Sequence, residues 1–231
     1  MQPKMVGKII VDLGMTILLM LLMAFELIGR TAHEWIGAGM FVLFIVHHIL
    51  NRKWSGNLFH GKYSSYRSLQ TVSAVLVFHA MLGSMVSAVL ISREVFTFLP
   101  INGGRSFGRT LHMLCAYWGF LFLSFHLGIH WNMILGMAGK LCRKPSKLRV
   151  RLIRTAGGLI AAYGVYALFR RDIPSYLFLQ NQFVFFDFEE PIIFFFCDYI
   201  AIMGLMSWIG HYFSKLLMRL VKSRCDRNDH I

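Results

Sequence analysis

The sequence is poor in charged residues, and acidic residues are the scarcest of them. Only 15% of its 231 residues are charged, with 11 Asp and Glu against 24 Lys and Arg. No polar segment is long enough to build a core of its own, so a soluble domain of useful size is excluded. The apolar residues make up 56% of the chain. They gather in runs of about 18 residues or more, the length that crosses a bilayer.

Six such runs predict an all-α, polytopic membrane protein. The first run follows Lys4 and Lys8, as in a secretory signal, but it carries Asp12 and lacks a clear cleavage site. A retained first helix is therefore expected. Residues 1–140 hold four predicted helices, and residues 141–231 hold two more with a basic tail. The predicted helices cover residues 8–29, 33–50, 71–92, 109–139, 152–169 and 191–217.

Paired cysteines are missing as well. The cysteines form neither a C-x-x-C nor a C-x-x-C-H motif, which argues against a thiol-redox site and against covalent c-type haem. A cysteine inside an apolar segment is usually a small hydrophobic residue. Any haem would therefore be bound without a covalent link. The four cysteines are Cys115, Cys142, Cys197 and Cys225.

The net charge of +13 lies in the loops and tails. The basic residues do not alternate with aromatic ones as in a nucleic-acid platform, so anionic lipid head groups are the expected partners. Lys and Arg concentrate in both tails and in the segments 51–70 and 140–154. The positive-inside rule therefore predicts cytoplasmic N- and C-termini.

Two pairs of histidines share one spacing. His33 and His47 are 14 residues apart, His112 and His126 are also 14 apart, and the second pair follows the first by 79 residues. In an α-helix, 14 residues rise about 21 Å and return to within about 40° of the same face. Both members of a pair therefore point the same way at two depths in the bilayer.

The predicted helices 33–50 and 109–139 run parallel, because one antiparallel helix separates them. His33 then faces His112 near the outer side, and His47 faces His126 near the inner side. Two imidazoles fill both axial positions of a haem iron, which leaves none open for oxygen and suits electron transfer. The alternative, polar residues satisfied by neighbouring helices, explains the repeated spacing less well.

Three further histidines crowd the level of His47 and His126. His48 points about 100° away from His47 around its helix. His130 follows His126 by one turn, and His79 lies on the predicted helix 71–92. Each is an alternative ligand, a partner of a haem propionate, or part of a quinone or proton site. His79 is the strongest alternative, and a propionate or interfacial role is expected for His130 rather than ligation. Solvated or interfacial roles are expected for His60, His211 and His230.

Basic and small residues flank the pairs. Arg105 and Arg109 on the outer side, and Arg52 and Lys53 on the inner side, are candidate partners of haem propionates or interfacial anchors. Several glycines allow close approach, either of a porphyrin or of another helix. These glycines are Gly37, Gly39, Gly83, Gly119 and Gly128.

The segments HEWIG (33–37), VHHILNRKW (46–54), LHMLCAYWG (111–119) and FHLGIHW (125–131) resemble those of small bacterial b-type membrane cytochromes, the flavinylation-associated cytochromes. More distantly they are similar to the di-haem core of cytochrome b and of formate dehydrogenase or hydrogenase cytochrome subunits. The resemblance implies a four-helix bundle with two non-covalent, bis-His haem b groups in a bacterial cytoplasmic membrane. It also implies electron transfer between a quinone pool and an extracytoplasmic partner such as a flavoprotein.

The implied haem ligands are His33, His47, His112 and His126. Whether the protein is an electron carrier or a subunit of a quinone-linked oxidoreductase stays open. One alternative is a proton or metal-ion transporter with a path through His79, Asp12, Glu26 and Asp198. Another is a membrane anchor for a larger complex, which is compatible with bound haem. Its docking surface would be the aromatic loop 171–190, which otherwise lies along the outer leaflet.

Overall fold

The structure, a computed structural model, describes residues 3–58, 60–61, 63–101, 103–141 and 146–228. Every regular element in these residues is a helix, and six helices are long and apolar enough to cross a membrane, which confirms the predicted fold class. Cys142 and His230 lie outside the described residues. The helices are α1 (Pro3–Met23), α2 (Phe25–Leu50), α3 (Arg52–Gly56), α4 (Ser65–Ile91), α5 (Arg105–Ile129), α6 (Trp131–Leu141), α7 (Lys147–Arg170), α8 (Ile173–Leu177) and α9 (Ile192–Asn228).

α1 and α2 form a tight hairpin. The apolar run predicts that the first helix ends at residue 29, but α1 ends at Met23 and α2 starts at Phe25. Ala24 makes the connection, and its side chain is only 1% exposed. The turn is itself buried and apolar, so hydropathy does not reveal it. Gly29, with φ 74°, kinks α2 after its first turn, a left-handed conformation that glycine adopts without strain.

α4 and α5 lie against each other along most of their length. Gly83 faces Cys115, and a Cβ on Gly119 would lie 3.3 Å from the Cβ of Ala80. A Cβ on Gly108 would lie 2.7 Å from the Ile91 side chain at the far end of the pair. Small residues thus let the two helices approach closely from end to end.

The predicted helix 109–139 is two helices. α5 ends at Ile129, α6 begins at Trp131, and His130 lies at the break. The His130 N–H still bonds the His126 carbonyl oxygen at 3.3 Å, so the chain turns without losing that hydrogen bond. His126 therefore lies in the last turn of α5, and His130 lies outside the helix.

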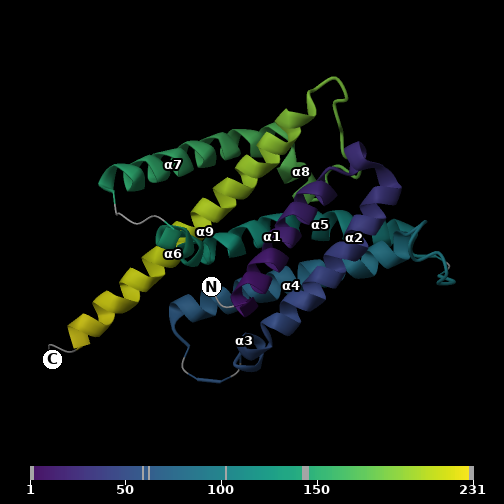
Figure 1. Cartoon of the computed structure of the whole chain (residues 1–231). Coiled ribbons are helices and arrows are strands. Elements are labelled where there is room, and N and C mark those ends of the chain that lie inside the picture. Colours follow the sequence, from purple (N-terminus) through teal and green to yellow (C-terminus); the bar gives the residue numbers. More distant parts are fainter. Residues whose placement is uncertain (1–2, 59, 62, 102, 142–145, 229–231) are drawn as a thin grey trace.

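α9 crosses both α5 and α7 and packs against both (Figure 1). It therefore connects the C-terminal helices to the earlier helices of the chain. A Cβ on Gly128 of α5 would lie 2.7 Å from the Ser207 Cα. A Cβ on Gly164 of α7 would lie 2.9 Å from the Ala201 carbonyl carbon. α9 also runs on to Asn228, beyond the end predicted at residue 217.

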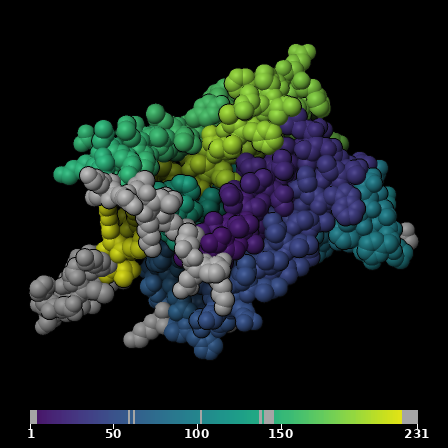
Figure 2. Space-filling model, viewed as in Figure 1, coloured from purple at the N-terminus to yellow at the C-terminus, as the bar shows by residue number. Residues whose placement is uncertain are grey.

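α1 and α2 occupy the front of the molecule in Figure 2, with α7 and α9 above and behind them. Large apolar side chains on α1 are exposed, among them Ile10, Leu13 and Ile17. Lipid tails are as apolar as leucine, so a bilayer is the environment that suits this face.

Candidate functional site

His33 and His112 lie side by side in the structure. His33 comes from α2, just after the kink at Gly29, and His112 comes from the second turn of α5. Their ring centroids are 5.9 Å apart, and the ring planes are inclined at 72°. This confirms that the two histidines face each other; that they ligate a haem stays a prediction. We call this pair the His33 level.

Serines of α4 hold both histidines of α5. The Nδ1 atom of His112 lies 3.1 Å from the Ser87 Oγ, and the Nδ1 atom of His126 lies 2.6 Å from the Ser73 Oγ. The serines are 14 residues apart, as the histidines are, because α4 and α5 run antiparallel with matched register. Both serine side chains are buried.

The hydrogen bonds at Ser87 define the tautomer of His112. The Ser87 hydroxyl donates to the Ser84 carbonyl oxygen at 2.9 Å, so its own oxygen accepts from the ring. The Ser84 carbonyl oxygen, 3.2 Å from Nδ1, is a second acceptor. Nδ1 therefore carries the proton, and Nε2 keeps the lone pair that a metal needs. Ser73 can hold His126 in the same tautomer.

The second level, which we call the His47 level, is built differently. The Nδ1 atom of His47 lies 2.7 Å from a carboxylate oxygen of Asp12 on α1. His47 and His126 are near enough to interact electrostatically, and both also interact with Asp12. Among the described residues no ring contact joins His47 to His126. The nearest ring to His126 is that of His130, with centroids 4.7 Å apart.

The other two histidines near this level in the sequence each use Nδ1 to bond a carbonyl oxygen of their own helix. His48 packs against Phe44 and Phe78, and its Nδ1 bonds the Phe44 carbonyl oxygen of its own helix at 2.9 Å. His79 is exposed, and its Nδ1 bonds the Val75 carbonyl oxygen of its own helix at 2.8 Å. Two of the three alternatives therefore contact a histidine of the predicted pairs: His130 contacts His126, and His48 contacts His47, its neighbour in α2, with ring centroids 5.5 Å apart.

Arg105 and Arg109 lie at the start of α5 and are exposed. They precede His112 by seven and three residues, which puts all three on one side of the helix. This placement suits partners for the propionates of a haem at the His33 level. At the other level, Arg52 and Lys53 begin α3, directly after α2, and are also exposed.

The glycines serve helix packing. A Cβ on Gly37 would lie 3.8 Å from Leu22, and one on Gly39 would lie 3.9 Å from Leu18, so both face α1. Gly83 and Gly119 face the partner helix within the α4–α5 pair, and Gly128 faces α9. Of the two interpretations open from sequence, close approach of a helix is therefore the one that the structure supports.

Glu34, the neighbour of His33, ties α2 to the connection between α4 and α5. Its carboxylate accepts the Arg93 N–H at 2.9 Å, the Glu94 N–H at 3.0 Å and the Val95 N–H at 3.1 Å. The Ser92 hydroxyl donates to it at 2.6 Å. Sequence alone gives no reason to single out this glutamate, because its acceptor role depends on a loop about 60 residues away.

His33 is the least supported of the four histidines. Its Nδ1 is buried and has no hydrogen bond of ordinary geometry with the described residues, although the Leu22 carbonyl interacts with the ring. The Phe25 ring packs edge-on against it, with centroids 5.1 Å apart. Most buried polar side-chain atoms in proteins have a hydrogen-bond partner, and His33 Nδ1 shares its lack of one with His211 Nδ1.

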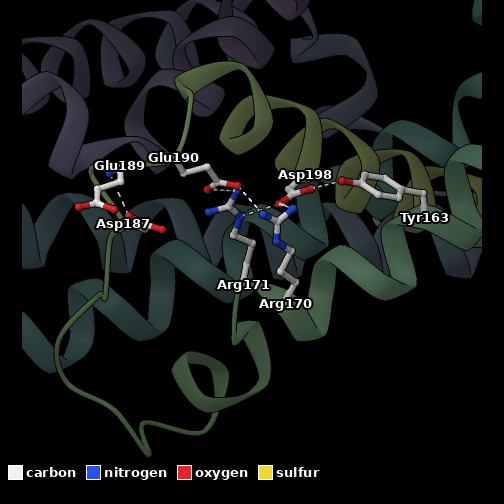
Figure 3. Close-up of polar contacts among 7 residues, drawn as sticks. All are labelled: Tyr163, Arg170, Arg171, Asp187, Glu189, Glu190 and Asp198. Carbon is white, nitrogen blue, oxygen red and sulfur yellow. Dashed lines mark hydrogen bonds and ion pairs between the residues drawn. The ribbon is translucent and has the colours of Figure 1, made fainter.

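A separate ionic cluster lies where α7 ends and α9 begins (Figure 3). Asp198, fully buried, accepts from the Arg171 Nε at 2.7 Å and from the Tyr163 hydroxyl at 2.6 Å. Glu190 pairs with Arg170 at 2.5 Å and with Arg171 at 2.7 Å. Asp198 is therefore neutralised locally, at the other end of the helices from Asp12. The carboxylates of the transporter hypothesis do not form one path.

The donor set suits a haem iron better than a bare metal ion. Within the described residues, no group of three or more His, Cys, Asp or Glu side chains is placed to hold a metal ion. A bis-His haem needs only two protein ligands at each level. The His33 level meets that need directly, with neutral imidazoles and an Nε2 lone pair on His112.

No family model, curated protein or solved structure matches the chain. The resemblance to b-type cytochromes therefore depends on the sequence segments themselves.

Proposed function

We propose that the chain is a di-haem b-type membrane cytochrome that carries electrons across the bilayer. The observation that supports this best is that both histidines of α5 bond a serine of α4 through Nδ1. His112 bonds Ser87, and His126 bonds Ser73. Both bonds use Nδ1 and leave Nε2 available, and they recur at the spacing that separates the two levels. Two histidines that served helix packing alone would not both need to keep Nε2 available.

The residues of the chain would have simple tasks. When bound, two haems would supply one-electron transfer at two depths in the membrane. The four histidines would hold the two haems, two histidines at each level. Arg105 and Arg109 would neutralise propionates at the His33 level, and Arg52 and Lys53 would do so at the His47 level. His130, in ring contact with His126, is placed as a further propionate or quinone partner.

The proposed electron partners come from the resemblance, and the proposed orientation comes from the loop charges. We propose a quinone pool as one partner and an extracytoplasmic flavoprotein or other redox subunit as the second. The excess of Lys and Arg at the His47 end supports a cytoplasmic location for both termini. The His33 level would then lie toward the outside of a bacterial cytoplasmic membrane. Protease accessibility of a C-terminal tag in inside-out vesicles tests this orientation.

A pyridine haemochrome assay on the purified full-length protein tests the haem content. The expected result is two haem b groups per chain. His112→Ala should lower this to one, because it removes one of two ligands at the His33 level. His79→Ala is the matched control: it also removes an intramembrane histidine, but one that bonds only its own helix, and it should keep both haems.

An apoprotein without haem absorbance, after expression with ample haem, would overturn the proposal. So would a His112→Ala variant that keeps two haems. A path for metal ions or protons would instead give uptake into liposomes by haem-free protein. The structure gives the transporter hypothesis little support, because Asp198 pairs with Arg171 and not with a group near Asp12.

A further inference from the structure

The four histidines differ in the group that their Nδ1 meets, and this difference bears on the two haems of the proposed function, on which the inference rests. His112 and His126 each meet a neutral serine hydroxyl. His33 has no firm acceptor. His47 alone meets a carboxylate, that of Asp12, at 2.7 Å. The His47 level therefore holds one carboxylate-bound imidazole, and the His33 level holds none.

The length of the Asp12 contact matches a charge-assisted hydrogen bond, which runs about 2.7–2.9 Å for nitrogen and oxygen. His47 is also the only side chain that pairs ionically with Asp12 among the described residues. Lys8, one turn earlier on α1, is directed elsewhere: its Nζ donates to the Asn51 Oδ1 at 2.8 Å. No described lysine or arginine side chain therefore forms an ion pair with Asp12.

A carboxylate that accepts the outer N–H of a ligating histidine makes the ligating nitrogen a stronger donor. A stronger axial donor favours the oxidised iron, and hydrogen bonding of the axial ligand is one of the means by which a protein sets a haem potential. A neutral serine acts in the same direction but more weakly, because a hydrogen bond to a charged acceptor is about twice as strong.

We propose that Asp12 is a positioning residue that, through His47, lowers the reduction potential of the haem at the His47 level below that of the His33 level. One electron would then pass downhill from the His47 level to the His33 level. The first haem goes from ferrous to ferric and the second from ferric to ferrous, and no proton is needed. The chain would in this way favour flow toward the end that carries Glu34 and Arg109.

An anaerobic redox titration of the purified full-length protein, followed by its α-band absorbance, tests this inference. Asp12→Asn keeps an oxygen acceptor and removes the charge. We expect the lower of the two midpoints to rise, with at least a tenfold change in the oxidised-to-reduced ratio at a fixed potential, about 59 mV for one electron. The low-spin bis-His signal should stay. Asp12→Glu should restore the wild-type value, and Glu26→Gln, the control on the other end of the hairpin, should leave both midpoints unchanged.

A second variant keeps the inference open to refutation if Asp12→Asn loses haem. His112→Ala should leave one haem, at the His47 level, and its midpoint should be the lower of the two wild-type values. A remaining haem at the higher value overturns the inference, as does an Asp12→Asn protein with two haems and unchanged midpoints. Absence of haem from the wild-type protein would instead overturn the proposed function itself.

Discussion

The crossing of α5 and α9 gives the sharpest prediction about stability. Gly128→Ala would put a Cβ 2.7 Å from the Cα and the carbonyl carbon of Ser207, whereas ordinary contacts begin at 3.4 Å. The Ser207 carbonyl oxygen would be nearer still, so the helices must separate by more than about 0.7 Å at this point, the difference between these two distances. The obstacle is backbone, which cannot rotate away as a side chain can. Gly210, on the facing turn of α9, has the same restriction against the Phe125 carbonyl oxygen.

The magnitude follows from two opposing effects. Overpacking costs about 1–3 kcal/mol, and rigid backbone puts this variant at the upper end. Alanine stabilises a helix interior by about 1 kcal/mol relative to glycine. The net loss is about 2 kcal/mol, which for a chain of this size lowers Tm by about 4–8 °C. Thermal unfolding in detergent, followed by size-exclusion chromatography of heated samples, measures it.

The matched control is Gly158→Ala on α7, where an added Cβ meets nothing within 4 Å. This variant should lose no stability. Gly128 lies two residues from His126. Moving α5 away from α9 at Gly128 should therefore weaken haem retention at the His47 level more than at the His33 level. If Gly128→Ala unfolds at the same temperature as Gly158→Ala, α5 and α9 do not lie as close together at Gly128 as described.

Three further changes probe the polar contacts. Ser87→Ala leaves the His112 Nδ1 with one acceptor and should weaken haem binding at the His33 level by about 10-fold or more, measured by haem transfer to an apoglobin. Glu34→Gln removes the charge that four donors share and should cost about 1–3 kcal/mol in the same thermal assay. Asp198→Ala removes the buried acid that pairs with the half-buried Arg171 and should cost about 3 kcal/mol.

Each of these has a result that contradicts it. A Ser87→Ala protein with wild-type haem off-rates would mean that the serine does not hold the ligand. An unchanged Glu34→Gln protein would show that the loop after α4 is fixed by other contacts. If the costs of replacing Asp198 and Arg171 singly add up to the cost of replacing both, the two side chains do not stabilise each other.

The sequence predicted the number of spans, but not where they end. Hydropathy sees an apolar run and nothing of a turn made by apolar residues, so it joined Ala24 and Gly29 to the first helix. It also missed the break at His130, because Ile129 and Trp131 on either side continue the apolar run. These boundaries depend on packing between helices, which a single run does not contain.

The histidine spacing predicted the His33 level well, because a rigid helix converts spacing into direction. The supporting residues were harder to find. Ser73 and Ser87 repeat the spacing of His126 and His112 in reverse order, a signal that becomes visible only when an antiparallel register of α4 and α5 is assumed. The sequence does not reveal the contact between Asp12 and His47, because no spacing rule links residues on two different helices.

α1 is therefore more than a membrane anchor. At the His33 level the α5 histidine gets its acceptor from α4, and α1 contributes the Leu22 carbonyl, a neutral group, near the His33 ring. At the other level α1 supplies the carboxylate that meets His47. A four-helix bundle with equivalent α1 contacts at both depths would give two similar sites. The single acidic residue near the start of α1 makes the two levels chemically unequal, and unequal sites are what directional electron transfer needs.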